Sequence, residues 1–421
     1  MKKIAIIGFG GAGYNAAKEV RRQDAEAEIH VYTDTDIGPY NPMLTTYYVK
    51  GAIPYDAMFP FGSLEQIERE LRLTVHRETP VTKLEPEIRT IHLANGSTAQ
   101  YDKILISTGA SAVMPPIPGL DLPGVFKMRT AMDAVAFKKR LDEGKIKTGL
   151  VIGASWVGIK VIEDLVTYGV ESTLVDGAPW AFFVATFEET ANRIQKDLED
   201  KGITVSCGQM LDHIEQEANG QLTAVMKSGQ RFTADTVAVC IGVRMNVGFL
   251  KESGLEMNRG VLVDKHMETN IPGIYAAGDC CEAIDIQCGK HRNIGVWFNA
   301  NKQGMVAGIP MEFDANVLVN LAHYLDYDFI SIGDVSSCEP EDEVYEYEDD
   351  QYYIRGVKKR GGGLKCVNVI NSADSNGILK NLFIKMFENE DAGLDIKSVC
   401  YLQWKGFPDS FINFLGGMTL D

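Results

Sequence analysis

The amino-acid sequence predicts an α/β fold with two similar parallel-sheet units and a C-terminal α+β unit. A short apolar run that ends in a glycine cluster occurs at residues 4–13 and again at 149–158, and a helical pattern follows each cluster. The end of the chain differs, because residues 342–357 and 364–371 alternate between polar and apolar side chains, as antiparallel strands do. These observations predict the fold class.

The length and charge of the chain narrow its possible functions. A chain of 421 residues is too long for one hydrophobic core and predicts two or three domains. The net charge of −17 argues against nucleic acid as a partner, since phosphate binding needs clustered Lys and Arg. No apolar run reaches the roughly 18 residues that span a bilayer, and the apolar run near the start is too short for a signal peptide. We therefore expect a cytoplasmic protein.

The eight cysteines all lie at residue 207 or later: Cys207, Cys240, Cys280, Cys281, Cys288, Cys338, Cys366 and Cys400. No C-x-x-C pair occurs, which argues against a zinc site or an iron–sulfur cluster. Without such a pair we expect no metal. A disulfide framework is not expected either, because the cysteines are scattered through a large chain without a secretory signal.

The first glycine cluster has the features of a dinucleotide-binding turn. Residues Lys3–Ile7 predict a buried parallel strand, and Gly8, Gly10 and Gly13 then supply the pattern G-x-G-x-x-G. The first glycine permits a tight turn, the second lets the backbone approach a pyrophosphate, and the third lets the helix pack on the strand. Residues 14–23 continue with helical spacing, so the helix N-terminus faces the phosphates.

An acidic residue follows at the distance that ribose binding requires. A second predicted strand, residues 27–33, ends at Asp34, about twenty residues beyond the glycines. A carboxylate at this place accepts a hydrogen bond from a ribose hydroxyl. Asp36 lies close by, so the sequence leaves open which of the two acids binds the ribose.

The second glycine cluster repeats the whole unit. A strand at 148–152 leads to Gly153, Ser155 and Gly158, and a helix follows to about Tyr168. Serine replaces the middle glycine; it is small enough for close approach, and its hydroxyl is a candidate hydrogen-bond partner for a phosphate. A Rossmann-like dinucleotide-binding unit is predicted here as well.

The acid of the second unit indicates which nucleotide it binds. Asp176 ends the strand at 171–176, where a carboxylate accepts a bond from an unmodified ribose 2′-hydroxyl and repels a 2′-phosphate. NADH is therefore favoured over NADPH. Two complete units imply two dinucleotides, and a nicotinamide with a flavin forms a natural hydride relay.

Three further segments resemble the two-dinucleotide-binding flavoproteins of the pyridine nucleotide–disulfide oxidoreductase superfamily. They are residues 101–119, 236–282 and 296–308, and the resemblance covers residues 1 to about 310. It implies an FAD domain at 1–112 and 245–311, an NAD(H) domain at 113–244, and a C-terminal interface domain at 312–421.

The resemblance also implies cofactor contacts. Beside the glycines and acids already named, the residues assigned to FAD are Val81, Thr108, Gly109, Arg129, Gly278, Asp279 and Trp297, and Gly242 is assigned to NAD. Asp279 is expected to cap a helix and face the ligand. Trp297 has two readings, a position near the flavin or a place in the core. Cys280 and Cys281 are expected to be packing residues.

The redox cysteine of the disulfide reductases in this superfamily is absent. They carry it just after the first nucleotide unit, and residues 34–59 contain no cysteine here. Residues 39–51 instead resemble a segment of rubredoxin, ferredoxin and nitrite-reductase-type flavoproteins, with Pro42, Thr46 and Tyr47 in place of Arg, Ser and Lys. Tyr40, Thr45, Thr46 and Tyr47 are therefore candidates for lining the reactive pocket, or they are core or helix-surface residues.

Lys160 is another departure, because many relatives carry Glu at this helix position. A lysine there has three possible roles: it contacts a cofactor phosphate, pairs with Glu163 on the helix, or is solvated. We include it with Thr45, Thr46 and Tyr47 among the catalytic candidates.

The C-terminal segment is predicted to be α+β. Residues 317–334 predict a strand, 342–357 and 364–371 antiparallel strands, and 375–389 an amphipathic helix. The acidic run at 339–350 has two readings, a solvated edge or a docking site for a basic partner. In relatives such a domain packs against a second subunit or covers the flavin, so a homodimer is expected.

The predicted activity is hydride transfer from NADH to FAD, followed by electron transfer to an acceptor without a thiol relay. The acceptor is a small redox protein in the first hypothesis. The alternatives are an NADH oxidase or small-molecule reductase that reacts at the flavin directly, and a non-enzymatic flavoprotein that senses NADH. The sequence does not identify the acceptor.

Overall fold

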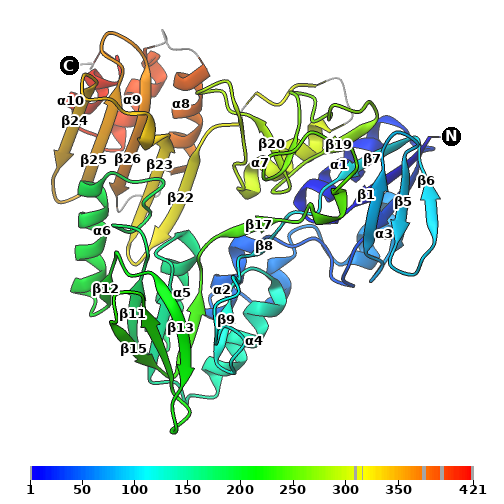
Figure 1. Ribbon diagram of the computed structural model, residues 1–421. Helices are drawn as coiled ribbons and strands as arrows, with labels where there is room; N and C mark the ends of the chain where they lie inside the picture. Colours follow the sequence, from blue (N-terminus) through cyan, green and yellow to red (C-terminus); the bar gives the residue numbers. More distant parts are fainter. Residues whose placement is uncertain (1, 308–310, 315, 372–375, 389–392, 419–421) are drawn as a thin grey trace. The chain divides into compact units, whose positions relative to one another are not determined.

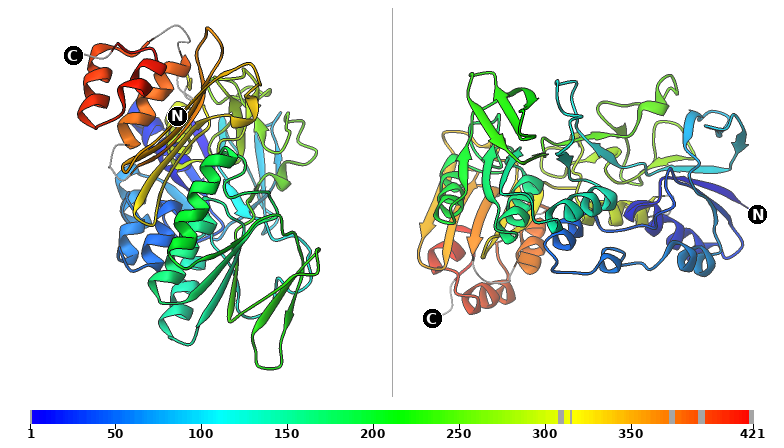
Figure 2. Two further views of the ribbon diagram at one scale, coloured as in Figure 1. Left: turned by 90° about the vertical axis from the view of Figure 1, so that its left-hand side faces the viewer. Right: turned by 90° about the horizontal axis from the view of Figure 1, so that it is seen from below.

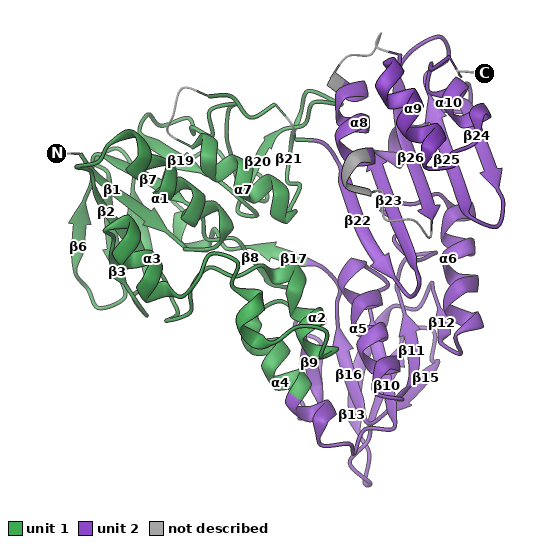
Figure 3. Cartoon of the chain, turned by 180° about the vertical axis from the view of Figure 1, so that it is seen from behind, with its two compact units in different colours: residues 1–113, 129–138, 243–316 green, residues 114–128, 139–242, 317–421 purple. Residues whose placement is uncertain are grey.

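The computed structural model describes residues 2–307, 311–314, 316–371, 376–388 and 393–418 (Figure 1). The chain forms two compact units, each made of three segments (Figure 3). Unit 1 contains residues 1–113, 129–138 and 243–316, and unit 2 contains 114–128, 139–242 and 317–421. The three domain boundaries expected from the sequence remain predictions, and residues 308–310 beside one of them lie outside the described residues.

A five-stranded parallel sheet forms the centre of unit 1. Its order is β19 (Ile274–Ala276), β7 (Lys103–Ile106), β1 (Lys3–Ile7), β2 (Glu28–Tyr32) and β3 (Thr74–His76). The strand predicted at Lys3–Ile7 is confirmed, and its isoleucines are buried because both faces of the sheet are covered.

Two helices pack closely beside this sheet. Helix α1 (Gly11–Gln23) begins three residues before the predicted start, and α7 (Trp297–Val306) lies beside it (Figure 1). A Cβ on Gly304 of α7 would clash with the Ala12 carbonyl of α1, so glycine is what permits this approach.

The remaining elements of unit 1 are short. They are η1 (Pro42–Leu44), α2 (Thr45–Val49), η2 (Tyr55–Met58), α3 (Leu64–Leu71), β4 (Val81–Glu85), β5 (Thr90–Leu93), β6 (Thr98–Gln100), β8 (Ala110–Ala112), β17 (Val243–Met245), η3 (Gly248–Leu250), β18 (Val261–Leu262), β20 (Cys281–Ile284) and β21 (His291–Arg292). Helix α4 (Ala131–Asp142) starts in this unit. The strand β8 pairs with β17, so segments far apart in sequence meet inside unit 1.

Unit 2 contains a second parallel sheet of the same kind. Its order is β12 (Thr204–Ser206), β11 (Glu171–Val175), β10 (Thr148–Ile152), β16 (Thr236–Val239) and β9 (Val125–Lys127). Its helices are α5 (Trp156–Thr167) and α6 (Glu188–Asp200), and a small antiparallel sheet contains β13 (Leu211–Gln216), β14 (Leu222–Met226) and β15 (Arg231–Ala234). The predicted strand at 148–152 is confirmed.

The C-terminal part of unit 2 is an antiparallel sheet with helices on one side (Figure 2). Its order is β22 (Val319–Tyr324), β23 (Tyr327–Gly333), β26 (Leu364–Asn371), β25 (Tyr352–Lys358) and β24 (Glu343–Glu348), and the other elements are η4 (Val335–Ser337), α8 (Asn376–Glu388), α9 (Ile396–Trp404) and α10 (Asp409–Phe414). The predicted helix at 375–389 corresponds to α8, although residues 375 and 389 lie outside the described residues.

One prediction for this sheet is wrong. Residues 317–334 form a hairpin of two strands, not one strand, and the chain turns at Leu325, whose φ is +49°. A leucine with a positive φ is rare. The turn contains neither glycine nor asparagine, the residues that usually mark such a turn, so the sequence does not reveal it.

Buried polar contacts join the C-terminal sheet to the second parallel-sheet region within unit 2. The Ser331 hydroxyl donates to the Ala185 carbonyl at 2.5 Å, and the Asn368 amide donates to the same oxygen at 3.0 Å. The buried Tyr324 hydroxyl donates to Asp197 Oδ2 at 2.9 Å. These hydrogen bonds between buried polar groups hold the C-terminal sheet against the parallel-sheet region of unit 2.

Candidate functional site

The first glycine turn is closed at two positions and open at one. A Cβ on Gly8, whose φ is +92°, would clash with the Ser107 carbonyl, and a Cβ on Gly13 would clash with the Gly8 carbonyl. At Gly10, in contrast, an added Cβ meets no atom within 4 Å. The open position is the one where the sequence predicts close approach of a pyrophosphate.

The N-terminus of α1 is suited to an anion. Gly10 precedes the helix and provides no side-chain cap, and the Tyr14 amide donates to the Gly10 carbonyl at 3.0 Å. The first turn of a helix carries backbone N–H groups without intrahelical partners and a partial positive charge. A bound phosphate satisfies these groups, so the residues present fit the pyrophosphate of a dinucleotide.

Asp34, one candidate for the ribose acid of unit 1, lies one residue later than Asp176 does in unit 2. The Gly8 amide donates to the Tyr32 carbonyl at 2.8 Å, and the Gly153 amide donates to Val175 at 2.7 Å, so Tyr32 and Val175 are equivalent. Thr33, not Asp34, therefore corresponds to Asp176. Asp34 and Asp36 are both exposed, and the choice between them stays open.

The second glycine turn is closed in the same way. A Cβ on Gly153 would clash with the Cys240 carbonyl, and one on Gly158 with the Gly153 carbonyl. Its middle residue differs, because the Ser155 hydroxyl donates to the Cys240 carbonyl at 3.0 Å and accepts from the Gly158 amide at 3.4 Å. Ser155 thus caps α5 itself, and its hydroxyl hydrogen is directed into the protein.

The acid of the second unit is held in place by the backbone. Asp176 Oδ2 accepts from the Ala154 amide at 2.5 Å, and Oδ1 accepts from the Ala178 amide at 2.6 Å. A carboxylate oriented by two amides retains lone pairs for a ribose hydroxyl. Gly242, also assigned to NAD, is exposed with a φ of +106° and an open Cβ position.

The residues after β7 form a braced turn. The Ser107 hydroxyl donates to the Gly8 carbonyl at 2.8 Å, and the Thr108 hydroxyl donates to the Asn246 carbonyl at 2.8 Å. The Asn246 side-chain amide donates back to the Thr108 carbonyl at 3.0 Å. Gly109 follows with a φ of +64° and no atom near its Cβ position. These bonds bring Thr108 and Gly109 beside the first glycine turn.

Arg129 and Asp279, both assigned to FAD, form an ion pair. Arg129 Nη2 lies 2.6 Å from Asp279 Oδ2, and Arg129 Nε donates to the Ala110 carbonyl at 2.9 Å. The Gly278 amide donates to Gln303 Oε1 at 2.8 Å. The expected helix after Asp279 is wrong, since strand β20 follows within the described chain. Its carboxylate therefore accepts from a guanidinium rather than from a helix terminus.

Aromatic side chains gather at the start of α1. The Trp297 ring stacks on Phe61 with centroids 5.9 Å apart, and Phe61 stacks on Tyr14 at 4.0 Å. A Cβ on Gly11 would come within 2.8 Å of the Trp297 ring. Trp297 thus lies against the first turn of α1 and is half-buried, which keeps both readings of this residue open. Val81, at the start of β4, packs against the core of unit 1.

The catalytic candidates of unit 1 lie on a short helix. Thr45 and Thr46 open α2 and are 3% and 6% exposed, and the Thr45 hydroxyl donates to the Pro42 carbonyl at 2.8 Å. Tyr47 is half-buried. Burial raises the pKa of the neighbouring Tyr40 phenol, so it stays protonated. The roles of these residues remain predictions.

Lys160 adopts the pairing role among the three that the sequence allowed. Its ammonium bonds the buried Glu163 carboxylate, and it donates to the His323 carbonyl at 2.5 Å. The Lys160 side chain is only 16% exposed. A catalytic role for Lys160 remains a prediction.

Cys280 and Cys281 fit the packing role. Both are buried as free thiols, and burial raises the pKa of each. The Cys280 thiol donates to the Ile106 carbonyl at 3.4 Å. Thiols of this kind are poor nucleophiles.

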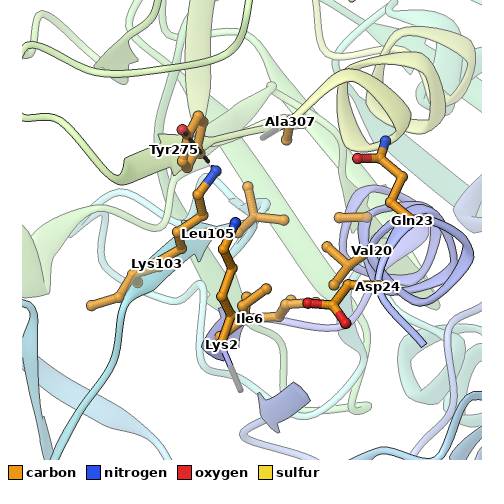
Figure 4. Close-up of a pocket in the computed structure, with 12 residues that line it drawn as sticks. Lys2, Ile6, Val20, Gln23, Asp24, Lys103, Leu105, Tyr275 and Ala307 are labelled. Carbon is orange, nitrogen blue, oxygen red and sulfur yellow. Dashed lines mark hydrogen bonds between the residues drawn. The ribbon is translucent and has the colours of Figure 1, made fainter. Parts of the chain in front are cut away.

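A small cavity in unit 1 lies at the other end of the sheet (Figure 4). Lys2 and Lys103 border it at the starts of β1 and β7, and Asp24 borders it at the end of α1. Lys103 Nζ donates to the Tyr275 hydroxyl at 3.3 Å. Dinucleotides bind at the carboxyl ends of parallel strands, so this cavity is separate from the predicted sites.

Three supporting residues were not found from the sequence: Ser107, Asn246 and Gln303. Gln303 is a polar residue buried within a helix, and Ser107 directly follows an apolar strand. These two features are the only hints of their roles that the sequence contains. The hydrogen-bond partners lie far away along the chain, and a single sequence does not reveal such pairs.

Comparisons with known proteins agree with this geometry. Residues 2–304 match the family model described as pyridine nucleotide-disulphide oxidoreductase. The chain is 32% identical to an NADH oxidase of Methanocaldococcus jannaschii over 311 residues, 73% of this chain and 69% of that protein. It is 28% identical to the NADH-dependent phenylglyoxylate dehydrogenase subunit epsilon of Aromatoleum evansii over 394 residues, 91% of each chain.

A solved structure shares the fold. The water-forming NADH oxidase of Lactobacillus brevis, bound to NADH, superposes with a TM-score of 0.85 at 21% identity and covers 92% of this chain and 91% of its own. Within the described residues, no helix is both long and apolar enough to cross a bilayer.

Proposed function

The chain belongs to the pyridine nucleotide-disulphide oxidoreductase family, and from this premise we propose that it is an FAD-dependent oxidoreductase that passes electrons from NADH to an acceptor without a thiol relay. The family membership confirms the resemblance drawn from the motifs. The observation that carries the proposal is the pair of glycine turns, each closed around a helix N-terminus at the carboxyl end of a parallel sheet.

Unit 1 provides the FAD site in this proposal. FAD supplies a flavin that accepts two electrons as hydride and releases them singly or in pairs. The open position at Gly10 and the uncapped start of α1 bind its pyrophosphate. The paired Arg129 and Asp279 and the braced Thr108–Gly109 turn orient the remainder of the cofactor. Thr45, Thr46 and Tyr47 line the flavin face.

Unit 2 provides the NADH site. Asp176, fixed by two amides, accepts a bond from the ribose 2′-hydroxyl and repels the extra phosphate of NADPH. The N-terminus of α5 binds the pyrophosphate through backbone N–H groups, since Ser155 is already engaged within the turn. These residues bind and orient NADH for hydride transfer.

The acceptor is proposed to be a redox centre on a partner protein. No cysteine precedes Cys207, so the usual thiol carrier is missing and the flavin must pass electrons on directly. The relative that matches over 91% of both chains is named as a subunit, which supports a partner protein as acceptor. Strand β24 is exposed, but each of its three glutamates pairs with a Lys or Arg of unit 2, so it favours the solvated-edge interpretation over a docking site.

A second candidate is direct reaction with oxygen. It is favoured by the relative named NADH oxidase, which is 32% identical to this chain. A homodimer is also proposed, because α9 exposes Ile396, Cys400 and Trp404 at four-residue intervals along one helix face. Ile396 is 64% and Trp404 76% exposed, which leaves a hydrophobic face for a second copy.

The test uses the purified chain. Anaerobic titration with NADH should bleach its yellow flavin absorbance, and NADPH should do so far less effectively. Rapid reoxidation only with an added redox protein supports the first candidate, and rapid oxygen consumption without one supports the second. A colourless protein that cannot be reconstituted with FAD contradicts both. A long-lived complex with NADH that no acceptor reoxidises indicates a sensor instead.

A further inference from the structure

Two cysteines in the C-terminal sheet of unit 2 lie outside both nucleotide sites. The Sγ atoms of Cys338 and Cys366 are 3.2 Å apart. We propose that these two thiols are a redox-active pair that a small disulfide compound oxidises to an intramolecular Cys338–Cys366 disulfide. This inference does not depend on the proposed function.

The backbone holds the two cysteines together. Gly333, at the end of β23, pairs with Cys366 on β26, and the turn that carries Cys338 starts at the next residue. The Asp334 carboxylate accepts from the Ser336 amide at 3.0 Å and stabilises this turn. Lys365, the neighbour of Cys366, donates to the Ser337 carbonyl at 3.0 Å. The sulfur contact therefore rests on a defined turn attached to the strand.

The two thiols differ in access. Cys366 is fully buried, whereas Cys338 is half-buried and open to a small reagent. The hydrogen bond between the two sulfurs lowers the pKa of Cys338, and the Lys365 ammonium acts in the same direction, against burial and the carboxylates of Asp342 and Asp334. The same hydrogen bond and burial raise the pKa of Cys366. Cys338 is thus the attacking thiolate and Cys366 the resolving thiol.

The reaction balances with a low-molecular-weight disulfide as the oxidant. The Cys338 thiolate attacks one sulfur of the compound, which forms a mixed disulfide and releases one thiolate. Cys366 then loses its proton and attacks the Cys338 sulfur, which releases the second thiolate. The protein loses two electrons and two protons, and the compound is reduced to two thiols.

Other cysteines in the described chain lack this combination. Cys280 and Cys281 are both buried, with the pKa of each thiol raised. Cys288 is exposed in the segment between β20 and β21 of unit 1, outside the α9 face proposed as the dimer contact. It provides the control, because a small reagent reaches this thiol directly.

The test is oxidation of the full-length protein by glutathione disulfide. After alkylation of free thiols and digestion, mass spectrometry should find one peptide pair joined through Cys338 and Cys366, and dithiothreitol should reverse it. The Cys288→Ser variant should form the same link. No link at equilibrium, or a glutathione adduct on Cys338 that never resolves in the unaltered protein, overturns the proposal.

Two variants separate the roles of the thiols. Cys366→Ser should trap the glutathione adduct on Cys338, and Cys338→Ser should block reaction at Cys366 because the remaining thiol is buried. If Cys366→Ser does not fold, Cys338→Ser at the half-buried position still tests the order of attack. Rapid modification of Cys366 in Cys338→Ser contradicts the assigned order.

Discussion

The two glycine turns have the same closed geometry but different middle residues. In both, the outer glycines face backbone carbonyls that leave no room for a Cβ. Gly10 leaves the N-terminus of α1 without a side-chain cap, whereas Ser155 caps α5 with its own hydroxyl. An uncapped turn gains most from a permanently bound anion, and a capped turn remains satisfied when its ligand leaves. The difference suits a resident cofactor in unit 1 and an exchanging one in unit 2.

The two candidate ribose acids, Asp34 and Asp176, also differ between the units. Asp176 is held by the amides of Ala154 and Ala178, so its carboxylate has a fixed direction without a ligand. Asp34 is exposed and lies one residue beyond the equivalent position. Specificity between two nucleotides needs a fixed acid, whereas a resident cofactor is held by many other contacts.

The largest expected effect comes from filling the open position of the first turn. Gly10→Val places a side chain where the pyrophosphate approaches, without a clash in the protein itself. Loss of two hydrogen bonds to charge costs about 3 kcal/mol, or roughly a hundredfold in FAD affinity. Flavin absorbance per mole of purified protein measures the effect.

The matched control is Gly248→Val in the same unit, where an added Cβ also meets no atom within 4 Å. It should retain its flavin. Equal flavin content in the two variants shows that Gly10 does not face the cofactor.

A smaller effect is expected at the acid of the second unit. Asp176→Ala removes a charge-assisted bond of about 1.5–3 kcal/mol, so the KM for NADH should rise about tenfold or more. The ratio of kcat/KM for NADH to that for NADPH should fall. Steady-state kinetics with both nucleotides measure this ratio, and Asp34→Ala should leave it unchanged. A larger change in Asp34→Ala reverses the comparison.

The cap itself is expected to contribute to stability. Ser155→Ala should lower the free energy of unfolding by about 1 kcal/mol, whereas Ser155→Gly, which recreates the first turn, should cost only a few tenths. Urea unfolding of the protein without NADH measures both. If the two variants lose equal stability, the hydroxyl does not act as the cap of α5.

The smallest expected effect is on pH dependence. Burial lowers the pKa of both His30 and His76 in unit 1, where His30 Nδ1 lies 3.0 Å from His76 Nε2. The unfolded chain then binds more protons below the ordinary value of 6.5, so stability falls as the pH drops through that value. In unit 2, hydrogen bonds to Asp212 and Glu215 raise the pKa of His213, and its contribution has the opposite sign.

Thermal unfolding between pH 8 and pH 5 (roughly the range in which His titrates) measures this difference. His76→Gln should weaken the loss of stability on acidification, and His213→Gln should strengthen it. If the unfolding temperature changes equally with pH in the two variants, the assigned pKa directions are wrong.

The sequence predicted the repeated units well because their signals are local. The strands Lys3–Ile7 and 148–152 are buried apolar runs that end at a glycine, and the structure has them at the predicted residues. The sequence predicts a later start for α1 than the structure has, because Gly11 and Gly13 are poor helix formers that join the helix through packing against neighbouring strands and α7.

The parts that sequence reasoning missed depend on distant partners. The hairpin turn contains Asp326 but neither Gly nor Asn, and nothing in the sequence indicates the positive φ of Leu325. The bond that the Ser155 hydroxyl donates depends on Cys240, eighty-five residues away in the chain. The one-residue offset of Asp34 appears only when the registers of both parallel sheets are compared.

The three-segment construction of each unit has a consequence for biosynthesis. Every strand of the parallel sheet in unit 2 lies between residues 125 and 239, whereas the sheet of unit 1 needs β19 at 274–276. A nascent chain leaving the ribosome therefore holds a complete second sheet before the first one has its last strand. The N-terminal strands of unit 1 therefore leave the ribosome well before β19, and the segment that forms the parallel sheet of unit 2 emerges between them.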